Sequence, residues 1–172
     1  MLTMLQFYVQ LCFLKKTPQD APYSKSLYYF AIAAYYFIGV LIISLTQAWF
    51  VAFVMSLLQL GLLMFLTNIL LWVWKAHERY EQTMTALTMS GAIVGLIAIP
   101  IMSSLGTSED QLVAPMIWFV LILWEAVIIG HIYRHAMEIS LPGGLGIAFV
   151  YMYLSFAVTL RLMKIVAAPF IE

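Results

Sequence analysis

Long apolar segments dominate the chain and are separated by short polar connections. Residues 27–74 contain no charged side chain, which at about 20 residues per crossing is too long for one membrane-spanning helix and suits two. Three further apolar segments follow at about 84–105, 113–133 and 145–167, and each is long enough to cross once. The pattern therefore predicts an all-α polytopic membrane bundle with about five transmembrane helices.

The predicted bundle occupies residues 27–168 and leaves only a short tail at 169–172. The turn between its first two crossings is placed near 46–50, because Gln47 and Trp49 suit a membrane interface. The other polar connections are 75–82, 106–111 and 134–144. None of them is long enough for a soluble domain.

The amino-terminal segment, residues 1–26, has a different pattern. Its first 14 residues are apolar except for Thr3, Gln6 and Gln10, whose spacing places them on one helical face. A helix of that length reaches about 21 Å, short of a roughly 30 Å hydrocarbon core. We predict an amphipathic helix and a loop, with the helix either lying along the interface or packed on the bundle.

Composition agrees with a membrane protein. The chain of 172 residues is 65% hydrophobic and 9% charged, whereas a soluble domain carries roughly 25% charged residues. The lipid bilayer is therefore the first expected partner. Eight basic and eight acidic residues give no net charge, so we expect no nucleic-acid partner. With Cys12 as the sole cysteine, an internal disulfide and a multi-cysteine metal site are excluded.

Basic residues in the connections predict the orientation. Lys and Arg gather in the connections before crossing one, after crossing two and after crossing four, which share one side: Lys15, Lys16, Lys25, Lys75, Arg79 and Arg134. Because basic loops stay on the cytoplasmic side, we expect a bacterial cytoplasmic (inner) membrane protein with a cytoplasmic amino terminus. Arg161 and Lys164 lie near the opposite side, where long side chains extend to the interface.

Glu125 is the leading candidate for function, because it stands near the middle of crossing four with no other charge around it. An ionised carboxylate at that depth is unfavourable by at least a few kcal/mol, so Glu125 should face the bundle interior. One hypothesis makes it a proton or cation site, or a hydrogen-bonding point for a lipid or quinone head group. The other makes it a neutral packing residue that bonds to Asn68, Gln59, Ser56 or a backbone carbonyl.

Histidine and glutamate recur at helical spacing beyond crossings two and four. His131, His135 and Glu138 share a helical face, and His77 with Glu81 forms a similar pair. Such residues can ligate zinc, iron or haem when a second helix completes the site. Helix ends also carry these residues for solvation alone. We therefore expect no metal or other cofactor.

Gly91 and Gly95 in crossing three are spaced so that another helix backbone can approach closely. We expect this face to pack within the bundle, and a partner subunit is the alternative occupant. The glycines at 143–146 follow Pro142 and are typical of a turn and a helix start.

The block Thr-Pro-Gln-Asp-Ala-Pro-Tyr-Ser at 17–24 resembles that of small uncharacterised bacterial membrane proteins, and the five-crossing layout is similar to the Yip1-like five-helix class. The Yip1-like resemblance implies a membrane-scaffolding or partner-recruiting role, and it carries over no catalytic residue.

The sequence contains no nucleophile–base pair, phosphate loop or nucleotide fingerprint, so we do not expect an enzyme. The function predicted first is a non-catalytic accessory or scaffolding subunit of a membrane complex, with other membrane subunits or a second copy as partner. The alternative is a small transporter or a lipid- or quinone-binding protein built around Glu125.

Overall fold

The computed structural model describes residues 2–21, 24–104 and 112–166, and at 2–5 and 163–166 only the backbone is described. All regular structure in these residues is helical. A short amino-terminal helix precedes five long ones: α1 (Leu2–Cys12), α2 (Lys25–Ser44), α3 (Trp49–Val73), α4 (Tyr80–Ser104), α5 (Val113–Met137) and α6 (Leu141–Val166). The five long helices are long and apolar enough to cross a membrane, which confirms the predicted fold class.

Several boundaries differ from the prediction. The connection expected at 134–144 shrinks to 138–140, because α5 continues to Met137 and α6 already begins at Leu141. Glu138, the capping residue that follows α5, takes a left-handed conformation with φ 57° and donates its N–H to the Arg134 carbonyl. Pro142 sits in the first turn of α6, where a missing N–H is tolerated.

The other connections are close to those predicted. The turn between α2 and α3 occupies 45–48, within two residues of the expected place. After α3, a 3-10 turn, η2 (His77–Arg79), leads directly into α4, which therefore begins four residues before the predicted 84. The expected connection at 106–111 and the tail at 169–172 lie outside the described residues.

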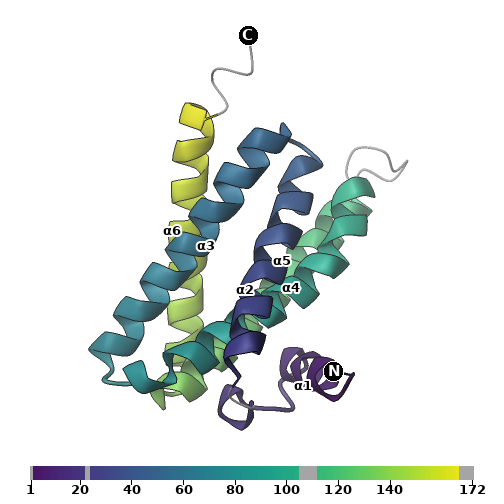
Figure 1. Ribbon diagram of the computed structural model, residues 1–172. Coiled ribbons are helices and arrows are strands. Elements are labelled where there is room, and N and C mark those ends of the chain that lie inside the picture. The colour runs from purple at the N-terminus through teal and green to yellow at the C-terminus, as the bar shows by residue number, and fades with distance from the viewer. Residues whose placement is uncertain (1, 22–23, 105–111, 167–172) are drawn as a thin grey trace.

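Helix α4 is the central helix of the bundle. It packs against α2 and α5, while α3 and α6 complete the ring by contacting each other and their chain neighbours (Figure 1). Its buried hydroxyls at Thr83, Thr85, Thr88 and Ser90 each donate to a backbone carbonyl four residues earlier. These bonds satisfy the polar groups without a partner helix, so α4 can be buried on several sides.

Helix α1 lies across the end of the bundle at which α2, α4 and α6 begin (Figure 1). Tyr8, Leu11 and Cys12 are buried, whereas Gln6 is exposed. The structure therefore shows α1 packed on the bundle, with an exposed polar residue on its outer face, and its location along a membrane interface stays a prediction. A 3-10 turn, η1 (Pro18–Asp20), follows it.

Basic residues gather at the same end. Lys25 begins α2, Lys75 follows α3 and Arg134 lies in the last turn of α5. We call this the basic end. Helix α3 is bounded by exposed aromatic residues, Trp49 and Phe50 at the far end and Trp72 and Trp74 at the basic end. Such belts are typical of the two interfaces of a membrane.

Candidate functional site

A cavity of about 620 Å³ opens inside the half of the bundle away from α1, and we call this half the cavity half. All five long helices contribute to its wall. Most of the wall is aliphatic or aromatic. The polar side chains that line it are those of Tyr35, Ser56, Gln59, Glu125, Tyr151, Tyr153, Ser155 and Thr159.

The cavity exists because α5 and α6 cross closely near the basic end. A Cβ atom on Gly144 would overlap the carbonyl oxygen of Gly130, and one on Gly130 would lie 3.1 Å from the Leu145 Cα. Only glycine permits backbones to approach so closely. From this crossing the two helices separate toward the far end (Figure 1). Exposed side chains such as Phe119 and Phe156 line the cavity between them.

Glu125 stands at the midpoint of α5 and lines this cavity. Its side chain is only partly buried. Within the described part of the chain, its carboxyl group forms no hydrogen bond or ion pair, and the side chains of Tyr35 on α2 and Tyr151 on α6 line the same space beside it. The site is therefore a lone carboxyl group flanked by two phenols inside an apolar cavity.

This arrangement corrects the hypothesis that Glu125 is held by a hydrogen bond to a neighbouring helix. Gln59 lines the same cavity, but its amide donates to the Thr159 hydroxyl at 3.5 Å. Ser56 is buried at the cavity wall, and its hydroxyl has no partner among the described residues. Asn68 lies outside the cavity on an exposed face of α3. It is too far along α3, toward the basic end, to reach the carboxyl group.

Gly91 and Gly95 face α2. A Cβ on Gly91 would lie 2.7 Å from the ring of Tyr35, and one on Gly95 would lie 2.7 Å from the Ile38 side chain. Both glycines also line the cavity. Because α2 covers them, this face is occupied within the chain and is not open to a partner subunit.

The candidate metal ligands do not converge. His131 and His135 lie side by side with ring centroids 4.5 Å apart, and His131 Nε2 bonds to the Lys16 carbonyl at 3.0 Å. His77 is exposed and stacks on Tyr80. The described residues contain no group of three or more His, Cys, Asp or Glu side chains placed to hold a metal ion.

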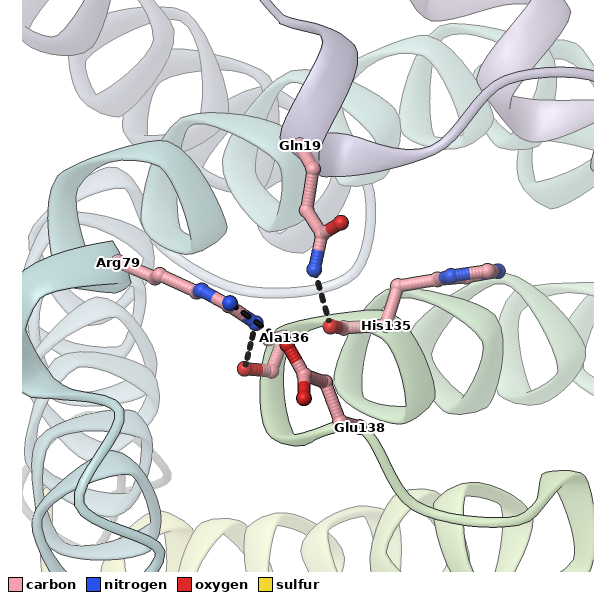
Figure 2. A network of polar contacts seen from close by, with 5 residues as sticks. All are labelled: Gln19, Arg79, His135, Ala136 and Glu138. Carbon is pink, nitrogen blue, oxygen red and sulfur yellow. Dashed lines mark hydrogen bonds and ion pairs between the residues drawn. The ribbon is translucent and has the colours of Figure 1, made fainter.

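Glu138, the remaining candidate metal ligand, instead pairs with Arg79 at the basic end. Its carboxylate accepts a hydrogen bond from Arg79 Nη2 at 2.6 Å, and Arg79 Nη1 also donates to the Ala136 carbonyl at 3.3 Å. From the other side, the Gln19 amide donates to the His135 carbonyl at 2.8 Å (Figure 2). The last carbonyl groups of α5, which have no partner within the helix, are thus satisfied by two distant segments.

Sequence reasoning found Glu125 and Gln59 but did not single out Tyr35 and Tyr151. The available signal was that both tyrosines stand near the middle of an apolar span, away from the interfaces where tyrosine is most frequent. A mid-span phenol needs a polar neighbour.

Comparison with known protein families, curated protein sequences and solved structures finds no match to this chain. The resemblance to the Yip1-like class therefore still depends on the layout of the crossings.

Proposed function

We propose that this protein binds a lipophilic small molecule in the cavity and holds its polar head group at Glu125. The observation that carries the proposal is a carboxyl group without a hydrogen-bond partner in the described residues, inside an apolar cavity of about 620 Å³. Cavities of roughly 300–1,000 Å³ with few polar groups are typical of small-molecule sites. A ligand that bonds to the carboxyl group would offset its desolvation.

The chemistry of the wall defines the ligand class. The apolar part accommodates a chain or ring body, and the exposed edge residues between α5 and α6 give a lateral route from the bilayer. The head group meets Glu125, Tyr35 and Tyr151, so it needs a hydrogen-bonding atom. Quinone-like and amine-bearing lipids both fit this description. The role is binding or transport, and we assign no reaction.

Thermal unfolding of the full chain in phospholipid nanodiscs tests the proposal, with decylubiquinone and dodecylamine as separate probes. A ligand at 100 times its Kd stabilises the folded state by about 2.7 kcal/mol. We expect one probe to raise Tm, and Ala126→Phe to abolish the rise because Ala126 lines the cavity. Ala33→Phe, at an exposed position on α2, is the matched control. The proposal is wrong if neither probe shifts Tm and no lipophilic compound copurifies.

A second candidate, favoured by Asn68, is an accessory subunit that associates through α3. An amide exposed on a membrane-spanning helix is unfavourable unless a neighbour bonds to it. Gly61, two turns away on the same face, has open space around it. An amide is both donor and acceptor, so a second copy of this chain related by a twofold axis would satisfy it.

Energy transfer between labelled copies in liposomes tests this association. Asn68→Leu should weaken self-association by roughly 1 kcal/mol, about fivefold, whereas Ile69→Leu on the adjacent exposed position should not. Equal association of the two variants would eliminate the second copy as the occupant of this face.

We also propose that the basic end faces the cytoplasm of a bacterial inner membrane. The support is the common location of Lys25, Lys75 and Arg134 at that end. A reporter inserted at Glu78 should be cytoplasmic, and one fused after Glu172 should be on the opposite side. Both reporters on the same side would contradict this orientation.

A further inference from the structure

We propose that the ligand of the cavity is a lipophilic organic cation whose ammonium group binds at Glu125, beside Tyr35 and Tyr151. This inference rests on the proposed function and narrows it, because the volume and the apolar wall do not by themselves distinguish an anion, a neutral quinone and an amine. The charge of the wall, the oxygen atoms beside Glu125 and the aromatic rings each favour the amine.

The charge of the wall disfavours an anionic ligand. Glu125 is the one acidic residue among the described residues that line the cavity, and none of these residues is Lys, Arg or His. Arg161 on α6 is exposed and lies outside this lining. A carboxylate or phosphate head group in the cavity would therefore lose its hydration without gaining a cationic partner. Fatty acids and anionic phospholipids do not fit this site.

An amine forms a pair with Glu125 that carries no net charge. A neutral amine can enter from the bilayer and meet a neutral carboxyl group. When the proton passes from the carboxyl oxygen to the nitrogen, one O–H bond breaks and one N–H bond forms, so the resulting ammonium–carboxylate pair is also neutral. Its charge-assisted hydrogen bond is roughly twice as strong as the neutral one that a quinone oxygen would accept from the carboxyl group.

Three oxygen-bearing side chains line the place where the head group would bind. Glu125, Tyr35 and Tyr151 line both the main cavity and a second space of about 20 Å³ that adjoins it. They belong to α5, α2 and α6, so the carboxyl group and the two phenols come from three different helices. A primary ammonium group has three N–H donors, and carboxylate and phenol oxygens both accept hydrogen bonds. An ammonium head group therefore has one donor for each of these side chains.

Aromatic rings make up much of the remaining wall. They come from α2, α5 and α6 and include Tyr35, Trp118, Phe119, Phe149, Tyr151 and Phe156. The face of an aromatic ring attracts a cation, and the attraction is stronger where water is excluded. A single acidic side chain among aromatic rings is thus suited to an alkylammonium head group, and the aliphatic part of the wall is suited to its chain.

Thermal unfolding of the full chain in phosphatidylcholine nanodiscs tests the inference with four probes. Dodecylamine, dodecanol and dodecanoate share one alkyl chain and differ in head group, and decylubiquinone is the neutral quinone. The Kd of each probe, expressed as its mole fraction in the bilayer, follows from the dependence of Tm on probe concentration. We expect dodecylamine to bind about tenfold or more tightly than dodecanol or decylubiquinone, equivalent to about 1.4 kcal/mol, and dodecanoate to bind most weakly.

Two variants locate the ammonium group. Glu125→Gln should remove the preference for dodecylamine over dodecanol, because an amide cannot form an ion pair. Glu78→Gln removes an exposed carboxyl group on the η2 turn, outside the cavity, and as the matched control it should keep the preference. Each Tm rise is measured from the probe-free Tm of the same variant, so a change in stability does not obscure the comparison.

The outcomes separate this inference from the proposed function. If dodecanol, dodecanoate or decylubiquinone binds as tightly as dodecylamine, the organic cation is wrong and the proposed function stands. A preference for dodecylamine that persists in Glu125→Gln would also overturn the inference, since the ammonium group would then bind elsewhere. If no probe raises Tm and no lipophilic compound copurifies, the proposed function itself is wrong.

Discussion

At the basic end, hydrogen bonds from three residues in two segments outside α5 hold that helix, whereas the described residues show none between α5 and α6 in the cavity half. Lys16, Gln19 and Arg79 supply the bonds at the basic end. Thr67 adds a further bond to Tyr133 nearby. In the cavity half, α5 meets apolar wall and empty volume instead.

This difference suggests that the basic end determines the stability of the bundle and that the cavity half determines binding. The hydrogen bonds at the basic end keep α5 in place there. Helices α5 and α6 can therefore separate in the cavity half without loss of the fold. Binding sites are commonly placed in the less stable part of a structure for this reason. Changes at the basic end should therefore affect stability, and changes in the cavity half should affect binding.

The largest expected effect is at the crossing of α5 and α6. Gly144→Ala should destabilise the protein by about 2–3 kcal/mol, because the added Cβ overlaps the Gly130 carbonyl and the backbones must separate. Unfolding in mixed detergent micelles measures the loss. Gly146→Ala is the control: no atom lies within 4 Å of its Cβ position, and alanine favours a helix by up to about 1 kcal/mol. Equal effects of the two substitutions would show that the crossing is not tight.

Replacing Glu125 should change the stability of the folded protein in the opposite direction to Gly144→Ala. Because its carboxyl group has no hydrogen-bond partner in the described residues, Glu125→Leu should stabilise the ligand-free protein by about 1 kcal/mol, while Glu125→Gln changes it little. Both variants should weaken binding of whichever probe the wild type accepts. Destabilisation by Glu125→Leu would instead revive the hypothesis of a structural hydrogen bond.

The helices were predictable from the sequence because each reflects a local property, the length of an uninterrupted apolar run. The turn at 45–48 lies near its predicted place for this reason. The helix ends at 134–144 were not predicted. There, polar residues that resemble a loop remain helical because Gln19 and Arg79 bond to the carbonyl groups of the last turn. A contact across 57 residues or more has no local signature.

In the candidate site, too, the sequence predicted local features and not the contacts between helices. The depth of Glu125 in its span was evident, since it depends on one helix alone. The surroundings of the carboxyl group were not evident. Asn68, Gln59 and Ser56 stand at different depths on the same helix, and the depth and rotation of that helix relative to α5 decide which of them line the cavity. The cavity itself results from Gly130 and Gly144, whose small size is visible in the sequence but whose meeting is not.

A smaller effect is expected for the ion pair at the basic end. Arg79 and Glu138 are 37% and 69% exposed, so their coupling in a double-mutant cycle should be roughly 0.5 kcal/mol and should decrease with salt. Arg79→Met should cost more than Glu138→Gln, because only Arg79 also bonds to the Ala136 carbonyl. Equal single-variant losses, or coupling that is independent of salt, would contradict this account.

The smallest effect concerns Asp20, which ends the η1 turn beside the basic end. The Thr17 hydroxyl and N–H donate to its carboxylate at 2.8 and 3.3 Å, and these bonds lower the pKa of Asp20 below its ordinary value. A lowered folded-state pKa stabilises the turn above the ordinary pKa of an aspartate, and this stabilisation is lost as pH falls through the lowered value. Thr17→Ala should therefore raise the pKa measured by carboxyl-carbon NMR. Lys16→Gln should raise it less, because the Lys16 charge contributes less than Thr17 does. A larger shift from Lys16→Gln would mean that charge, and not hydrogen bonding, sets the pKa of Asp20.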